Sequence, residues 1–272
     1  MRIALGVSYL GTAYHGWQSQ LDGLTVQDKL EFALNRFADT KPQLTPNRRI
    51  GTLCAGRTDA GVHAHMQVVH FDTDVERSEA AWVRGVNAYL PKDIAVQWAK
   101  EVPCSFHCRA SAVTRSYAYA LLESAVRPSL DSRRVGWVFR PLDRTAMQAA
   151  ASFLVGEHDF TSFRAAQCQA LTPIKDLHRI DIVSQGEPMH RYWRFEFEGN
   201  AFLHHMIRNI MGCLVTIGQG MKPPEWMKEV LDAKSRKMAA PTFSPDGLYF
   251  LGPTYGAEWD IPKTPLFAYG LI

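Results

Sequence analysis

The sequence predicts an α+β protein made of two ferredoxin-like halves, residues 1–104 and 105–272, which share a mixed, mainly antiparallel sheet with helices on one face. The order of periodic segments in the first half is strand, helix, two strands, helix, strand, which is the ferredoxin-like order. The second half repeats this order with insertions. No low-complexity run and no proline-rich linker separates the halves, so we expect one fused sheet.

The first half begins with an expected strand over residues 3–9, where large apolar residues alternate with small ones. Thr25 stands three residues before Asp28, a spacing typical of a helix start. Apolar residues then recur at helical spacing as far as Phe37. The remaining expected elements of this half are strands at 50–55 and 66–71, a helix from Glu79 to Asn87, and a strand from Ile94 to Trp98.

The clearest helix lies in the second half, where apolar residues between 203 and 215 trace a narrow stripe. Arg208 flanks this stripe, a position that suits a charge at the edge of a core. Tyr117 and Tyr119 are expected on one face of a strand. The other expected elements are strands at 113–122, 177–184, 191–198 and 248–251, and helices at 143–155 and 224–232.

Composition limits the possible classes of protein. The chain has 272 residues, of which 46% are hydrophobic and 21% charged, so a largely disordered protein is excluded. The formal net charge of +3 is too small to identify a nucleic-acid binder by itself. We find no apolar stretch long enough to span a membrane and no signal peptide. Five cysteines in a chain of this length indicate reduced thiols and a cytoplasmic location.

Common cofactor motifs are missing from the sequence. It contains no G-x-G-x-x-G, no Walker P-loop and no G-x-S-x-G. Cys104, His107 and Cys108 lie close together, but no second ligand pair follows at zinc-finger spacing. Ordinary thiols and a surface or packed histidine explain these residues better than zinc, so we expect no metal and no cofactor.

The segment GRTDAGVHA, residues 56–64, is the strongest candidate for a site. Arg57 and Asp59 lie two residues apart, between Gly56 and Gly61. Aspartate is common in tight turns, and spacing alone favours that interpretation. The glycines fit both possibilities, because they permit turns and also let a bulky ligand approach the backbone.

This segment resembles the signature of the tRNA pseudouridine synthase A family. The resemblance extends from about residue 3 to 255, with one departure at Ser116, where the family usually has an arginine. That departure concerns only a possible phosphate contact. Further similar segments, in the family's order, are VSYLGTAYHGWQSQ (7–20), SFHCRASAVTRSYAY (105–119), GEHDFTSFRAAQCQA (156–170), NAFLHHMIRNIMGCLV (200–215) and PDGLYF (245–250).

The resemblance implies the pseudouridine synthase fold, a homodimer with tRNA lying across both subunits, and no cofactor. It implies that uridine is converted to pseudouridine in the anticodon arm, at nucleotides 38 to 40. Asp59 is then the catalytic carboxylate, Tyr117 lies against the target base, Arg208 pairs with the aspartate, and Leu248 lines the pocket. From their surroundings alone, Tyr117 and Leu248 would be packing residues and Arg208 a surface cation.

The implied reaction suits these residues. It breaks a C–N bond, rotates the base and forms a C–C bond, without redox change or hydrolysis. A carboxylate nucleophile can divide one hard step into two, although attack on the base, attack on the sugar and proton removal from the sugar all remain open. The target uridine must first leave its stack. His63 and His65 are expected to be hydrogen-bonded or solvated rather than a second base.

Affinity is expected to come mainly from phosphates. Arg57 and Arg109 are the favoured contacts, and the further candidates are Arg48, Arg49, Arg84, Arg115 and Arg164. Two other functions stay open at this point. A non-catalytic RNA-binding protein could share the fold, but the intact segment around Asp59 argues against it. A glycosidase usually needs two carboxylates that flank the bond, and only one aspartate has a convincing context.

Overall fold

The computed structural model describes residues 1–38 and 49–263, and it confirms the α+β class. Five helices and ten strands are present in these residues, and the strand pairs include both antiparallel and parallel ones. The chain divides into two compact units, Met1–Val113 with the segment from Phe250, and Thr114–Tyr249. The division at residue 104 was inferred from the order of elements rather than from compactness, and it stays a prediction.

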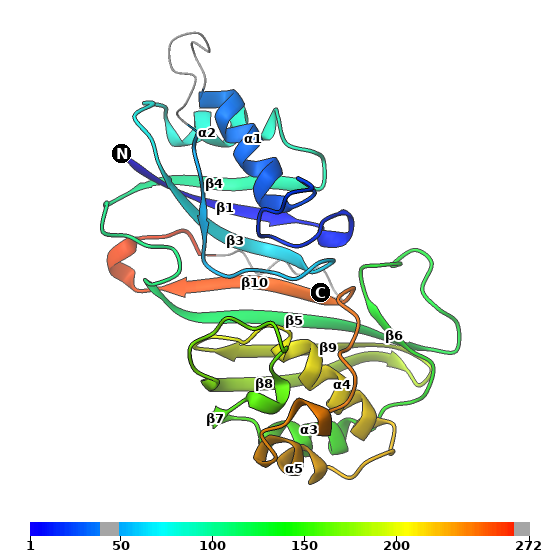
Figure 1. Ribbon diagram of the computed structural model, residues 1–272. Helices are drawn as coiled ribbons and strands as arrows, with labels where there is room; N and C mark the ends of the chain where they lie inside the picture. Colours follow the sequence, from blue (N-terminus) through cyan, green and yellow to red (C-terminus); the bar gives the residue numbers. More distant parts are fainter. Residues whose placement is uncertain (39–48, 264–272) are drawn as a thin grey trace. The chain divides into compact units, whose positions relative to one another are not determined.

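The first unit is a sheet with two helices packed on it (Figure 1). Its elements are β1 (Arg2–Tyr9), α1 (Val26–Ala38), β2 (Leu53–Cys54), β3 (His63–Asp72), α2 (Glu79–Asn87), β4 (Ile94–Val102) and the part of β10 (Leu248–Tyr255) from Phe250 onward. β1 is antiparallel to both β3 and β4, and β10 follows β3 in the strand order. The predicted order of elements in this half is confirmed, although β2 is only two residues long.

Side chains cap both helices of the first unit. The backbone N–H of Asp28 donates to Oγ1 of Thr25 at 3.3 Å, as the spacing of these residues predicts. Ser78 accepts from the backbone N–H of Ala81 at 3.2 Å. These bonds satisfy amides that would otherwise lack a partner within the helix.

Trp82 on α2 joins the two helices to the sheet. Its side chain is fully buried, and its ring centroid lies 5.2 Å from Phe37 on α1 and 5.3 Å from Phe71 on β3, edge-on in both cases. A Cβ added to Gly85 would lie 2.0 Å from the Phe37 ring, so the helices approach closely at this glycine. One aromatic cluster therefore sets the packing of the first unit.

In the second unit, four strands follow one another in the sheet in the order β5-β9-β8-β7. The short strand β6 pairs in parallel with β5. Its elements are β5 (Ala112–Ser124), β6 (Gly136–Val138), α3 (Arg144–Ser152), β7 (Gly156–Asp159), β8 (Ile174–Glu187), β9 (His190–Gly199), α4 (Met206–Gly218) and α5 (Trp226–Asp232). β6 and β7 were not expected, because elements of three or four residues carry too little periodicity. α3 contacts β8, α4 and α5.

The helix α4 is buried on more sides than its apolar stripe predicts. Asn209 and Gly212 lie outside the stripe and are also buried. A Cβ on Gly212 would lie 2.3 Å from the carbonyl oxygen of Pro241, so the chain passes directly over the helix there. The helix begins at Met206 rather than at 203, because His205 has a left-handed backbone with φ of 62°, which cannot continue a helix.

We predict that Trp82→Ala lowers the free energy of unfolding of the first unit by about 3–5 kcal/mol, the usual cost of truncating a buried aromatic side chain. Urea denaturation followed by circular dichroism measures this change. Phe32→Ala on α1 is the matched control, because Phe32 is 59% exposed. Equal losses in the two variants would contradict the central role of Trp82.

Candidate functional site

The segment that carries Asp59 links β2 to β3 and contains a tight turn. The backbone N–H of Val62 donates to the carbonyl oxygen of Asp59 at 3.1 Å, and Gly61 has φ of +80°. Side chains other than glycine rarely adopt such a φ. The turn that spacing alone favoured is therefore present, and Asp59 stands half-buried at its first position.

A second loop, residues 10–17 between β1 and α1, is bonded to this turn through the backbone. The N–H of Trp17 donates to the carbonyl oxygen of Thr58 at 3.0 Å. The N–H of Gly61 donates to the carbonyl oxygen of Tyr14 at 3.3 Å. The two bonds lie on either side of Asp59 in the chain, so its backbone position is fixed by the neighbouring loop.

Side chains add two further bonds between the same segments. The hydroxyls of Tyr9 and Thr58 are 2.7 Å apart, and the backbone N–H of Gly11 donates to Nδ1 of His63 at 2.9 Å. The His63 side chain is fully buried. Because its Nδ1 accepts, the neutral ring carries its proton on Nε2. The expectation of a hydrogen-bonded histidine is therefore confirmed for His63, and His65 lies half-buried on β3.

Two glycines let the loop lie directly against the turn. Gly16 has φ of +91°, and a Cβ there would lie 2.7 Å from the carbonyl oxygen of Thr58 and 3.1 Å from the carbonyl carbon of Asp59. A Cβ on Gly11 would lie 1.9 Å from the carbonyl oxygen of Val62. No other residue fits at either position without moving the turn.

Further polar side chains hold the two segments from outside. The hydroxyl of Tyr14 donates to Oδ1 of Asp93 at 2.6 Å, and the N–H of Leu10 donates to the carbonyl oxygen of Asp93 at 2.9 Å. Burial and the bond with Asp93 raise the pKa of Tyr14, so its hydroxyl stays a donor. Gln67 is fully buried and bonds both the N–H and the carbonyl of Gly56. The sequence did not single out Gln67 or Asp93.

Arg57 and Arg109, the two favoured phosphate contacts, are both exposed. The positive charge of each lowers the pKa of the Cys54 thiol. Nη2 of Arg109 lies 3.7 Å from the Cys54 sulfur. Burial raises the pKa of that thiol, and the two guanidinium charges oppose the rise. The structure thus brings these two cations to the same part of the first unit, next to the strand that precedes the turn.

The other candidate arginines separate into two groups. Nη1 of Arg115 donates to the carbonyl oxygen of Asn200 at 2.8 Å. Nη2 of Arg164 donates to the carbonyl oxygens of Cys168 and Ala170 at 2.7 and 2.9 Å. These two guanidiniums stabilise loops of the second unit. Of the remaining candidates, Arg49 and Arg84 are exposed and Arg48 lies outside the described residues.

In the second unit, Tyr117 is a buried residue of β5. It lies opposite Phe197 of β9, and its ring is perpendicular to that of Phe202, with the centroids 5.1 Å apart. Ser116 pairs with Glu198 in the same ladder. These contacts hold the tyrosine ring in one orientation, which suits a packing role and equally a fixed surface for a base.

Arg208 on α4 is half-buried and joined to the segment that leads into β10. Its Nε donates to the carbonyl oxygen of Phe243 at 2.8 Å, and the N–H of Phe243 donates back to the carbonyl oxygen of Arg208 at 3.1 Å. The hydroxyl of Tyr119 donates to the carbonyl oxygen of Ser244 at 2.8 Å. Leu248 is buried at the end of this segment. The guanidinium is therefore held by the protein, which argues against a side chain that simply extends to solvent.

Asn209, next to Arg208, was missed at the level of sequence. It is fully buried, and its Nδ2 donates to the carbonyl oxygen of Phe163 at 2.7 Å. Its Oδ1 accepts from the Thr242 hydroxyl at 2.7 Å and from Nη2 of Arg236 at 3.1 Å. A single amide thus fixes α4 to two other segments. The available signal was a polar residue inside an otherwise apolar helical run.

Among the described residues, His70, His107 and Cys108 place possible metal-ligand atoms within 4.8 Å of one another. Their hydrogen bonds, however, suit neutral side chains. Nδ1 of His70 accepts from the N–H of Cys108 at 3.3 Å, and Nδ1 of His107 accepts from the N–H of Arg109 at 3.2 Å. Each ring then carries its proton on Nε2, which leaves no lone pair there for a metal. Burial also raises the pKa of Cys108 to about 12. This supports the interpretation of ordinary packed residues.

The sequence relationships identify the family. The family model described as tRNA pseudouridine synthase matches residues 6–109 and 150–256. "tRNA pseudouridine synthase A" of Albidiferax ferrireducens is 64% identical over 268 residues, covering 98% of each chain. The proteins of the same name from Acidovorax ebreus and Polaromonas naphthalenivorans are 64% and 66% identical over 272 and 263 residues, covering 96% and 97% of each chain.

Among solved structures, a chain of "Crystal Structure of a Cbf5-Nop10-Gar1 Complex" overlaps at 11% identity with a TM-score of 0.32, covering 78% of this chain and 45% of that one.

The family match defines an RNA-modifying isomerase. This chain belongs to the tRNA pseudouridine synthase family, as its sequence motifs indicated. The matched ranges include the turn with Asp59, the helix with Arg208, and Leu248. Tyr117 lies between the two matched ranges.

We predict that Gly16→Ala destabilises the protein more than Gly23→Ala does. Both glycines have positive φ, which costs an alanine roughly 1–2 kcal/mol. Only at Gly16 does the new methyl group also collide with the backbone of Thr58, since nothing lies within 4 Å of a Cβ at Gly23. Urea denaturation and hydrogen exchange of the Trp17 and Gly61 amides measure the difference. Equal exchange protection in the two variants would contradict this account.

Proposed function

We propose that this enzyme converts uridine to pseudouridine in the tRNA anticodon arm, at nucleotides 38 to 40, with Asp59 as the nucleophile. The observation that carries the proposal is the fixed turn. Asp59 is half-buried on a backbone that residues 10–17 hold from both sides, and it lies inside a range matched by the family. A positioned carboxylate is what covalent catalysis requires.

The proposed chemistry rearranges the bonds of the nucleoside and leaves its atomic composition unchanged. The bond between C1′ of the ribose and N1 of uracil breaks, the base rotates, and C1′ bonds to C5. The proton on C5 passes to solvent, and N1 gains one. As the nucleophile, the Asp59 carboxylate forms a transient covalent bond with the base or with C1′ of the sugar, and this bond breaks again before the product leaves. No electron acceptor and no bound cofactor is required.

The remaining site residues take roles that match their chemistry. Tyr117 provides an aromatic face for the extruded base, and its ring is already held by Phe202. Arg208 pairs with the Asp59 carboxylate and keeps it ionised, because a nearby cation favours the charged form. Leu248 is an apolar wall that excludes water. Arg57 and Arg109 bind phosphates, which suits their exposure.

The proposal also covers how the tRNA binds, the oligomeric state of the enzyme and its location in the cell. The target base flips out of its stack, at a cost of a few kcal/mol that is lower in a loop or at a stem end. The tRNA lies across both subunits of a homodimer, and the enzyme works in the cytoplasm. None of the helices in the described part of the chain has the length and apolar character of a membrane span.

One assay tests the activity. The protein is incubated with an unmodified tRNA transcript that bears tritium at uridine C5. Tritium release without free base supports the proposed isomerisation. Retained tritium with tight binding would indicate a non-catalytic RNA-binding protein, and release of free uracil would indicate a glycosidase. Mapping of pseudouridine in the product then shows whether nucleotides 38 to 40 are the targets.

We predict that Asp59→Asn reduces tritium release below detection and keeps the Kd for tRNA within about tenfold, because phosphate contacts supply most of the affinity. Asp232→Asn, at an exposed residue that pairs with Lys228, is the matched control and should retain full activity. A parallel loss of turnover and binding in Asp59→Asn would contradict the assigned role.

We predict that Arg208→Met slows the single-turnover rate on the order of a hundredfold, the effect typical of removing one charge-stabilising donor, and changes the Kd for tRNA much less. Arg208→Lys keeps a positive charge and should recover part of the rate. A wild-type single-turnover rate in the methionine variant would refute the proposed pairing with Asp59.

A further inference from the structure

Three neighbouring side chains of the second unit form an exposed strip, here called the aromatic strip: Trp137, Phe139 and Arg140. Phe139 is 57% exposed and Trp137 is 38% exposed, and their ring centroids are 6.0 Å apart. The guanidinium carbon of Arg140 lies 5.5 Å from the centroid of the Phe139 ring, a cation–π contact. Nε1 of Trp137 donates to the carbonyl oxygen of Ser124 at 2.8 Å, which fixes the indole.

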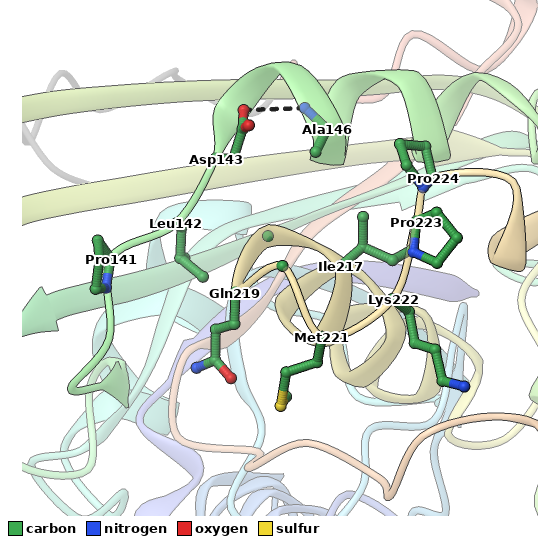
Figure 2. A pocket seen from close by; sticks show the side chains of 12 residues that line it. Pro141, Leu142, Asp143, Ala146, Ile217, Gln219, Met221, Lys222, Pro223 and Pro224 are labelled. Atoms are coloured by element: carbon green, nitrogen blue, oxygen red, sulfur yellow. Dashed lines mark hydrogen bonds between the residues drawn. The ribbon is translucent and has the colours of Figure 1, made fainter.

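The aromatic strip leads into an open hollow. Nη1 of Arg140 lies 3.9 Å from the sulfur of Met221, and Met221 lines a hollow of about 750 Å³ together with Lys222 and Pro141 (Figure 2). The side chains of Met221 and Lys222 extend to the same side in this view. The ammonium of Lys222 lies 5.7 Å from the centroid of the Trp226 ring, so a second cation–aromatic pair adjoins the hollow.

The segment that carries the aromatic strip has a positive net charge. Residues 126–144 contain five arginines and two aspartates. Both aspartates have internal partners, since Asp131 accepts from the Tyr192 hydroxyl at 2.7 Å and Asp143 accepts from the N–H of Ala146 at 3.1 Å. A second copy of the chain docked here by twofold symmetry would place like charges opposite each other. A polyanion fits the charge better.

We propose that the aromatic strip and the hollow bind unpaired nucleotides of the RNA substrate, away from the reacting uridine. Bases stack on Phe139 and Trp137, while Arg140 and Lys222 contact phosphates. Proteins that bind single-stranded RNA combine stacking rings with cations in this way. The proposal rests on the proposed function only in taking RNA as the substrate. The strip lies between the two ranges that the family model matches, so the family match assigns it no role.

The test measures binding by fluorescence anisotropy over a series of salt concentrations. The probe is a labelled oligouridylate of about ten nucleotides, a length within the usual site size of proteins that bind single-stranded RNA. Phe139→Ala should weaken binding about tenfold and leave the salt dependence unchanged, because stacking releases no counterions. Arg140→Ala should weaken binding and reduce the slope of log K against log salt by about one.

The matched control is a similar pair in the first unit, where the guanidinium of Arg36 lies 5.9 Å from the Tyr89 ring. Arg36→Ala and Tyr89→Ala should bind the oligonucleotide as the wild type does. Thermal unfolding midpoints of all four variants establish that each is folded.

Unchanged affinity in Phe139→Ala, or an equal loss in Tyr89→Ala, would overturn the proposal. A changed sedimentation coefficient with unchanged RNA affinity would also overturn it and identify a protein interface instead. Failure of the proposed function is a separate result. Wild-type protein that binds the oligonucleotide through Phe139 but releases no tritium would refute only the isomerase assignment.

Discussion

The hydrogen bonds between residues 10–17 and the turn at Asp59 are the constraint on which the proposed chemistry depends. A carboxylate on a free loop would have to be ordered each time a substrate binds, at a cost in conformational entropy. Here the backbone on both sides of Asp59 is already bonded, through Thr58 and Gly61, before any RNA arrives. Positioning is thus a property of the folded chain and does not have to be supplied by the substrate.

Buried polar side chains maintain this order. His63, Gln67 and Asn209 are each fully buried, and each has a hydrogen-bond partner in a different segment of its own unit. A buried amide or imidazole without a partner costs free energy, so these residues favour one arrangement of the loops over its alternatives. In both units, then, polar contacts fix the loops while aromatic and aliphatic packing stabilises the sheets and helices.

The long elements could be predicted from the sequence, because their periodicity extends over several turns or alternations. The bounds of α2, Glu79–Asn87, match the prediction. The short strands β6 and β7 were missed since three or four residues carry no measurable period. The start of α4 was placed too early because nothing in the apolar pattern reveals the left-handed backbone of His205.

For the candidate site, the motif identified the residue types but not the side chains that hold the site's loops in place. Asp59 and Arg57 could be selected from spacing and resemblance. Gln67, which bonds Gly56 beside the turn, and Asp93, which bonds Tyr14 far earlier in the chain, could not. The arginines show the same limit. Arg115 and Arg164 look like phosphate contacts in the sequence, yet their guanidiniums bond backbone carbonyls. Composition gives the charge of a side chain but not what that charge already binds.

The close fit at Gly11 and Gly16 has a consequence for how this protein can diverge. A methyl group at either position would meet the backbone of the facing turn, and no rearrangement of side chains could relieve a clash with main-chain atoms. Natural variation in the loop of residues 10–17 is therefore coupled to the geometry of the Asp59 turn. We expect descendants of this chain to keep both glycines or to exchange the two loops together.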